Sequence, residues 1–390
     1  MISFGNLTTA EFTQRYWQKE PLLVRQALAK PQSLITPETL LNLGRSGQCE
    51  SRLIEHTLAK GWKLTHGPIT KLPSESSKTA WTILTQAVDT QIQAIADLMN
   101  QFRFAGDALL DDVMISYANH GGGVGPHVDS YDVFLIQLHG TRRWQIKRDT
   151  NPKFIEGLPL KILKHFKPSQ EWLLEPGDML YLPAGWAHDG VAVGTTMTAS
   201  VGFRAPSPAE WVSSFLIDCA DNLEQVMPSA LSAPRFHQKL GIGAKPEKQK
   251  PAQIGANLEQ YLGTWVQELT ANPKRLARHA AEFSGRYLTE PKPAVVFAAP
   301  NKILSLEKFV VKSRLKGLKI GLGTRVLYNQ KQFFINGESF QVNTHQITLL
   351  AKLANQKTLS GNECANAHLD LIESLHDWYL NGWIIFNART

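Results

Sequence analysis

Short apolar runs separated by turn-forming residues dominate the first half of the chain. Gly, Pro, Asp and Ser bound these runs, which lie at residues 22–24, 81–88, 111–117, 133–138 and 179–182. This alternation of turn and short strand is typical of a β-barrel. Gly140 predicts a turn after the run 133–138, and residues 197–203 predict a further strand beyond residue 188. Helical spacing at residues 9–17 and 90–102 predicts helices beside the barrel.

From Ser207 onward the apolar positions change to helical spacing. Ser207 is a good N-cap with Pro208 in the first turn, and the predicted helices cover residues 208–222, 257–270 and 273–287. The predicted helix 257–270 carries an apolar face that cannot close a core alone. This face consists of Leu258, Tyr261, Leu262, Trp265 and Leu269. It therefore predicts packing against a second copy of the chain, that is, a homodimer.

The last 90 or so residues combine strands and helices, as in a winged-helix-like module. Residues 324–342 predict strands joined by a tight turn at Asn336-Gly337, and residues 344–355 and 369–381 predict helices. The second of these helices is acidic, which argues against direct nucleic-acid binding and favours a protein-interaction or structural role.

These patterns together predict an α+β chain with three parts. Residues 1–205 are expected to form the barrel domain, residues 206–288 the helical dimerisation region and residues 301–390 the winged-helix-like domain. A linker rich in Pro and Ala is expected between residues 289 and 300.

Composition narrows the class of protein. With 390 residues the chain can form about two or three domains. Its formal net charge of +7 is compatible with attraction to a nucleic-acid-rich assembly or with a solvated basic surface. Three widely spaced cysteines argue for a reducing compartment. Neither a signal peptide nor an apolar run of about 18 residues is evident, so we expect a cytoplasmic protein without membrane contact.

Candidate chemistry is concentrated at two stretches. Gly121 to Pro126 form a Gly-rich bend that leads into His127-Val128-Asp129, and a second turn presents His188. In an extended strand His127 and Asp129 point to the same face. Two imidazoles and one carboxylate on one side of a metal leave its other side open, which is the ligand set of non-haem Fe(II) oxygenases.

A 2-oxoglutarate enzyme also needs a cation for the far carboxylate of that cosubstrate. Arg142 is the candidate, because its planar guanidinium suits a carboxylate better than a lysine does. Arg143, its neighbour on the opposite face, is interpreted as a solvated charge.

Four motifs together carry a family resemblance: YWQKEPLLVRQA, DDVMISYANHGGGVGPHVDSYDVFLIQ, LEPGDMLYLPAGWAH and SVGFRAP. With them the chain resembles the Jumonji-C type ribosomal oxygenases, and it is most similar to their bacterial arginine hydroxylase branch. The resemblance implies a double-stranded β-helix of the cupin class, with Fe(II), 2-oxoglutarate and O2 as cofactor and cosubstrates. It also implies a ribosomal protein substrate and a dimer through the helical region.

The resemblance further implies roles for residues beside the triad. Ser116 is expected to hydrogen-bond the cosubstrate, with help from Thr198 or Ser200. A substrate arginine needs an apolar or aromatic surface and a carboxylate, which Met114, Tyr131 and Asp112 offer close to the metal. For these side chains an ordinary structural role remains an alternative.

Other functions remain open at this point. The same family contains histidyl hydroxylases, which would prefer a different target residue. A non-oxygenase cupin would not turn over 2-oxoglutarate, and Arg142 with Ser116 argues against it. A ligand-sensing transcription regulator would bind DNA in a salt-dependent manner.

Overall fold

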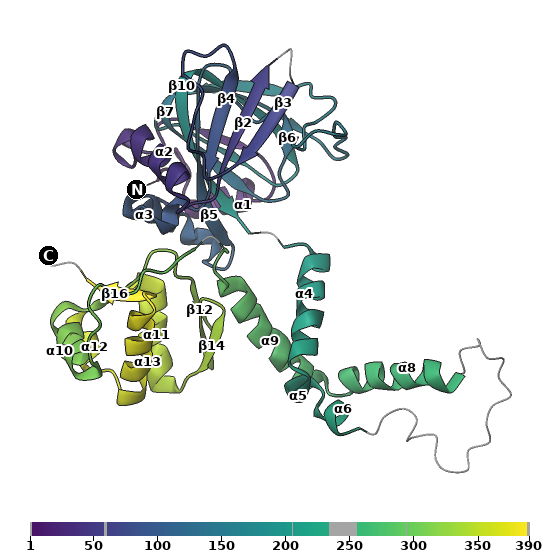
Figure 1. Cartoon of the computed structure of the whole chain (residues 1–390), viewed down its shortest axis with the longest axis vertical. Helices are drawn as coiled ribbons and strands as arrows, with labels where there is room; N and C mark the ends of the chain where they lie inside the picture. Colours follow the sequence, from purple (N-terminus) through teal and green to yellow (C-terminus); the bar gives the residue numbers. More distant parts are fainter. Residues whose placement is uncertain (1, 58–60, 205, 234–255, 294, 388–390) are drawn as a thin grey trace. The chain divides into compact units, whose positions relative to one another are not determined.

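The structure is a computed structural model that describes residues 2–57, 61–204, 206–233, 256–293 and 295–387 (Figure 1). Its contacts divide the chain into two units. The first contains residues 1–205, 291–326 and 344–390, and the second contains residues 206–290 and 327–343. The expected loop near Ala244 to Pro251 lies outside the described residues. No helix in the described ranges is long and apolar enough to cross a membrane.

A 10-stranded antiparallel sheet is the main element of the first unit. Its strand order is β1-β9-β7-β10-β5-β4-β2-β3, with β6 paired to β10 and β8 paired to β7. In Figure 1 the strands β2, β3 and β4 lie side by side at one end of this order. The strands are β1 Leu22–Val24, β2 Ser51–Thr57, β3 Gly61–His66, β4 Ala80–Thr85, β5 Leu110–Ala118, β6 His127–Val128, β7 Val133–Arg148, β8 Gln170–Leu174, β9 Met179–Leu182 and β10 Trp186–Phe203.

The predicted turn at Gly140 is wrong, because β7 runs without a break from Val133 to Arg148. Gly140 has φ +63°, and an added Cβ would clash with the carbonyl oxygen of Thr195 on β10. The glycine therefore permits a close approach of two paired strands rather than a chain reversal. Likewise His188 and residues 197–203 lie on one strand, β10, with register shifts between Val193 and Thr198.

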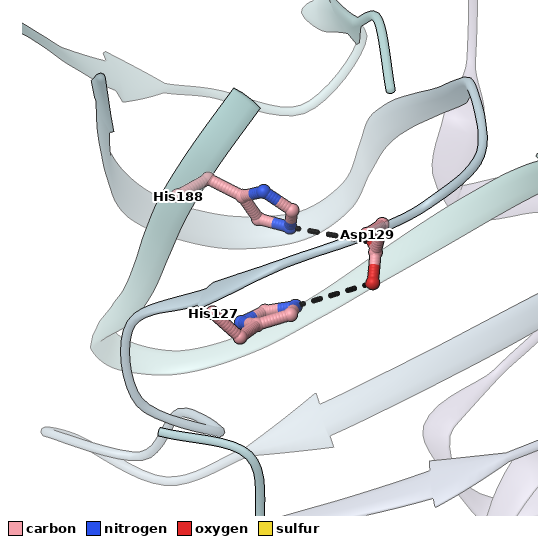
Figure 2. A group of neighbouring side chains, drawn as sticks. All are labelled: His127, Asp129 and His188. Atoms are coloured by element: carbon pink, nitrogen blue, oxygen red, sulfur yellow. Dashed lines mark ion pairs between the residues drawn. The ribbon is translucent and has the colours of Figure 1, made fainter. Parts of the chain in front are cut away.

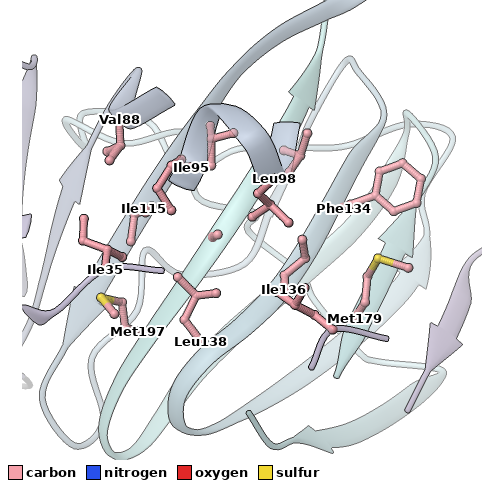
Figure 3. Packing of buried hydrophobic residues seen from close by; sticks show 14 of the residues in the cluster. Ile35, Val88, Ile95, Leu98, Ile115, Phe134, Ile136, Leu138, Met179 and Met197 are labelled. Carbon is pink, nitrogen blue, oxygen red and sulfur yellow. The ribbon is translucent and has the colours of Figure 1, made fainter. Parts of the chain in front are cut away.

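Strand alternation on β7 separates two apolar layers. Phe134, Ile136 and Leu138 are fully buried in the main core, in one cluster with Ile95 and Leu98 of α3 (Gln93–Met99), as Figure 3 shows. Val133 and Leu135 point to the opposite side, where they join a second cluster with Trp144 and Trp186. The sheet thus has one face packed under helices and another that lines the interior of the barrel.

The helix predicted at residues 9–17 is confirmed: α1 (Thr9–Arg15) begins with a capping box between Thr8 and Glu11. The sequence did not predict α2, which spans Pro37–Ser46. The predicted helix at residues 90–102 is divided into η2 (Val88–Thr90), α3 and η3 (Asn100–Ala105), and η1 covers Pro31–Ser33.

The C-terminal part of the first unit is a small helical module with its own core. A three-stranded sheet of order β15-β11-β16 packs beside the helices, and Phe309, Leu375 and Trp378 are buried there. The elements are α10 Leu306–Lys316, β11 Leu318–Ile320, α11 Thr344–Gln356, β15 Thr358–Leu359, α12 Gly361–Ala365, α13 Leu369–Leu380 and β16 Ile384–Phe386. The predicted helices at 344–355 and 369–381 are confirmed by α11 and α13.

The second unit combines helices with a β-hairpin. The predicted turn at Asn336-Gly337 is confirmed, with φ +48° and +86° at the two residues. An added Cβ at Gly285 of α9 would clash with the ring of Phe334 on the hairpin, so α9 and the hairpin pack closely. The elements are α4 Pro208–Asp221, α5 Leu223–Val226, α6 Pro228–Ser232, α8 Ala256–Ala271, α9 Pro273–Thr289, β13 Gln332–Ile335 and β14 Glu338–Gln341, and β12 Val326–Tyr328 crosses the boundary between the units.

The boundary between the two units runs through the expected domain 301–390, because the hairpin belongs to the second unit and helices α10 to α13 belong to the first. The three expected ranges 1–205, 206–288 and 301–390 therefore stay a prediction about which parts fold independently.

Candidate functional site

His127, Asp129 and His188 converge inside the barrel. Strand β6 pairs with β10 so that His127 lies directly opposite His188, and Asp129 follows β6 by one residue. One ligand atom from each of the three side chains lies within 4.8 Å of the other two. Figure 2 shows both imidazoles pointing toward the carboxylate of Asp129. The spacing in the sequence and the strand register together build this cluster.

Backbone carbonyls fix the orientation of both imidazole rings. The Nδ1 atoms of His127 and His188 lie 2.9 Å from the carbonyl oxygens of Gly125 and Trp186, respectively. Since a carbonyl only accepts hydrogen bonds, each Nδ1 carries the proton and each Nε2 keeps its lone pair. The Nε2 atoms face Asp129 at 4.0 and 3.6 Å. This is the arrangement that metal-binding histidines require.

The electrostatics of the cluster favour a neutral imidazole at His188. Burial and the neighbouring His127 together lower the pKa of His188 to about 4, against the opposing charge of Asp129. A neutral ring is the form that binds metals. Two nitrogen donors and one oxygen donor fit a divalent first-row transition metal such as Fe(II), with coordination positions left over for other ligands.

Arg142 is a buried cation in the same cavity. It lies on β7 and is 3% exposed. Its guanidinium donates hydrogen bonds to Ser116 Oγ at 2.8 Å, to Thr198 Oγ1 at 3.3 Å and to the carbonyl oxygen of Gly190 at 3.1 Å. Burial lowers its pKa to about 10, so the group still carries its charge at neutral pH. None of the described carboxylates forms an ion pair with it.

Two buried N–H donors at this site have no hydrogen-bond partner among the described residues. They are Nε of Arg142 itself and the indole Nε1 of the neighbouring Trp144. The Arg142 guanidinium lies 5.2 Å from the centre of the Trp144 ring. An added Cβ at Gly190 would come within 2.6 Å of that ring, so glycine is required there. Unpaired buried donors next to a buried cation fit the carboxylate of an anionic ligand such as 2-oxoglutarate.

One cavity of about 440 Å³ connects the triad with every predicted cosubstrate and substrate residue. Thr198 and Ser116 are direct cross-strand partners, and both contact Arg142. Ser200 lies opposite Met114, farther along the strands, and no hydrogen bond links it to Arg142. Of the two hydroxyls left open by the sequence, Thr198 is therefore the one beside the cation.

The predicted substrate side chains line the same cavity. Tyr131 is 39% exposed, whereas Asp112 on β5 is only 4% exposed. Asp112 Oδ2 accepts hydrogen bonds from the side chain of Gln86 and from the backbone N–H of Ala87, both at 3.0 Å. Gln86 and Trp144 were not identified from the sequence, because a glutamine at a strand end and an apolar residue in a strand carry no distinctive signal.

Known protein families match both the barrel region and the C-terminal region of the chain. Residues 97–211 match the JmjC domain family, and residues 256–384 match the ROXA-like winged helix family. The ribosomal protein uL16 3-hydroxylase of Escherichia coli is 32% identical, over 90% of this chain and 89% of that protein. A probable ribosomal oxygenase of Haemophilus influenzae is 28% identical, over 97% of this chain and 96% of its own.

Solved structures agree with these matches. The X-ray structure of E. coli ycfD has a TM-score of 0.81 and 28% identity, and it covers 99% of this chain and 100% of its own. A structure of E. coli YcfD, described as a ribosomal oxygenase in complex with cobalt and 2-oxoglutarate, has a TM-score of 0.77 and 28% identity, covering 98% and 99% of the two chains.

The fold and the site define a JmjC-domain protein of the cupin class with a winged-helix C-terminal domain, as the sequence predicted. Within that class, the chain belongs to the ribosomal oxygenase family.

Proposed function

We propose that the protein is an Fe(II) and 2-oxoglutarate dependent hydroxylase that acts on an arginyl residue of a large-subunit ribosomal protein. One observation carries the proposal: a His-Asp-His cluster and a buried arginine without a carboxylate partner in the described chain open into the same cavity. A similar protein named for hydroxylation of ribosomal protein uL16 supports the choice of substrate class.

The metal would be held by Nε2 of His127, Nε2 of His188 and the carboxylate of Asp129. When bound, Fe(II) with 2-oxoglutarate and O2 supplies the oxidising chemistry that adds one oxygen atom to a C–H bond. Arg142, with the hydroxyls of Ser116 and Thr198, would bind the far carboxylate of the cosubstrate. The residues of the chain otherwise position the reactants and exclude water, and none of them has to act as a general base.

The substrate arginine would enter beside the triad. Tyr131 and Met114 provide an aromatic and an apolar surface for its stem and guanidinium plane, and Asp112 provides a carboxylate for its donors. A histidyl target would use this carboxylate less well, because an imidazole lacks the forked donors of a guanidinium.

The partners follow from the same proposal. A ribosomal substrate places the enzyme in the cytoplasm, and the formal net charge of +7 suits approach to an RNA-rich particle. The second unit offers an apolar surface for a homodimer, since α4 exposes Val212, Leu216 and Ile217 by 55%, 53% and 64%.

The test is incubation of the Fe(II)-loaded protein with 2-oxoglutarate and total ribosomal proteins, followed by peptide mass spectrometry. We expect one added oxygen on an arginyl residue of a large-subunit protein. Oxygen on a histidyl residue would place the protein in the histidyl hydroxylase branch. No oxidised peptide, together with salt-dependent retention on DNA, would favour a ligand-sensing regulator.

A further inference from the structure

A lysine outside the barrel sequence reaches the carboxylates at the rim of the substrate cavity. Lys292 follows α9 in the sequence, but its segment belongs to the same unit as the barrel. Its Nζ lies 2.9 Å from Asp111 Oδ2 and 3.0 Å from Asp112 Oδ2. Among the described residues, Lys292 is the one cation within ion-pair distance of Asp112. Asp111 has a second cation, Arg325, at 3.6 Å.

The two oxygens of Asp112 face different surroundings. Oδ2 lies 3.0 Å from Lys292 Nζ and accepts hydrogen bonds from Gln86 and Ala87. Oδ1 lies on the side of Gly202, where an added Cβ would be 3.8 Å from Oδ1 and 3.9 Å from the Tyr131 ring. Oδ2 is therefore held by its three donors, whereas Oδ1 is directed toward the cavity that Tyr131 lines.

We propose that Lys292 is a positioning residue for substrate recognition: it holds the carboxylate of Asp112 in the orientation in which Oδ1 can bind the guanidinium of the substrate arginine. The inference rests on the proposed function and assigns part of substrate recognition to the C-terminal half of the chain. Lys292 acts through Asp112, because it lines the neighbouring cavity of about 370 Å³ and is not among the residues of the active-site cavity.

Local sequence and local charge both support this role. Pro291 and Pro293 flank Lys292, so its backbone is restricted to extended conformations before the contact forms. The carboxylates of Asp89, Asp111 and Asp112 also line this neighbouring cavity together. Burial and the charge of Asp112 raise the pKa of Asp89 to about 7. Without Lys292, Asp112 would be a buried anion beside other acids and would lose its preferred orientation.

The test measures binding of an arginine-bearing ribosomal peptide by fluorescence anisotropy, with Mn(II) and 2-oxoglutarate present and O2 excluded. We expect Lys292→Met to weaken peptide binding about tenfold, the size expected for one charge-assisted contact, and Lys292→Arg to restore it. Affinity for 2-oxoglutarate should not change. Lys319→Met is the matched control, because Lys319 lines the same cavity but its Nζ hydrogen-bonds Gln93.

The same change in an Asp112→Asn background separates positioning from general stability. If Lys292 acts through Asp112, Lys292→Met adds little to the loss already caused by Asp112→Asn. An equal loss in both backgrounds would overturn the inference, and so would unchanged peptide binding by Lys292→Met alone. In both cases the wild-type protein would still hydroxylate the peptide. Failure of the proposed function is a separate result: the wild-type protein would then add no oxygen to the peptide.

Discussion

His127 and His188 are direct cross-strand partners, and each ring is fixed by the carbonyl oxygen of the residue two positions earlier in the chain. The antiparallel register of β6 and β10 therefore sets the distance between the two imidazoles, and the backbone sets their rotation. A site arranged in this way needs little rearrangement when a metal binds.

The first prediction concerns the metal ligands. His188→Ala should weaken Co(II) or Mn(II) binding by at least about 100-fold, because the remaining histidine and carboxylate provide neither the affinity nor the geometry of a three-ligand face. Anaerobic isothermal titration measures this directly. His139→Ala, which removes an exposed histidine of β7, is the control. Normal metal affinity in His188→Ala would exclude the cluster as the metal site.

The second prediction concerns the cosubstrate. Arg142→Met should raise the KM for 2-oxoglutarate by about tenfold or more, since a charge-assisted contact contributes about 1.5–3 kcal/mol. Metal binding should remain normal, because the hydrogen bonds of Arg142 go to Ser116, Thr198 and Gly190 and not to the triad. Arg143→Met changes the half-buried neighbour and should leave the KM unchanged. An unaltered KM in Arg142→Met would place the carboxylate anchor elsewhere.

The third prediction concerns pH and stability. Burial and the charge of Asp112 raise the pKa of Asp89 to about 7. Because the folded protein binds this proton more tightly than the unfolded chain does, Asp89 lowers the free energy of unfolding as pH rises toward 7. Asp89→Asn should remove that slope and gain stability relative to wild type between about pH 5 and 7. Urea unfolding at each pH tests this, and parallel curves for the two proteins would contradict it.

The fourth prediction concerns assembly. Leu216→Asp should convert a homodimer to a monomer, because it places a charge in the exposed apolar face of α4. Light scattering at micromolar concentration gives the mass, and circular dichroism shows whether the fold is kept. Glu224→Gln, a change on the neighbouring helix α5, is the control. A monomeric wild-type protein would reject the dimer.

Local signals in the sequence were sufficient for the triad and for most strands. His127 and Asp129 follow a Gly-rich bend, and the bend and the alternation of a strand are both encoded by adjacent residues. The choice between Thr198 and Ser200 could not be made in the same way. It depends on the register of β10 against β5, which places Thr198 opposite Ser116.

Long-range contacts account for what the sequence did not predict. Gly140 appeared to be a turn because a glycine with positive φ serves equally well for a reversal or for a close strand approach. Lys292 appeared to belong to a linker, and nothing near it in the sequence indicates its contact with Asp112, 180 positions earlier. Such a contact depends on how distant segments pack.

The most direct measurement of the central claim is a turnover assay under isotopically labelled O2. The Fe(II)-loaded protein, 2-oxoglutarate and an arginine-bearing peptide from a large-subunit ribosomal protein are incubated, and peptide mass and succinate are quantified together. We expect labelled oxygen on the arginyl residue and succinate in an equal molar amount, with neither formed by Asp129→Ala. Succinate without labelled peptide for every ribosomal substrate, or label in the Asp129→Ala reaction, would contradict the account.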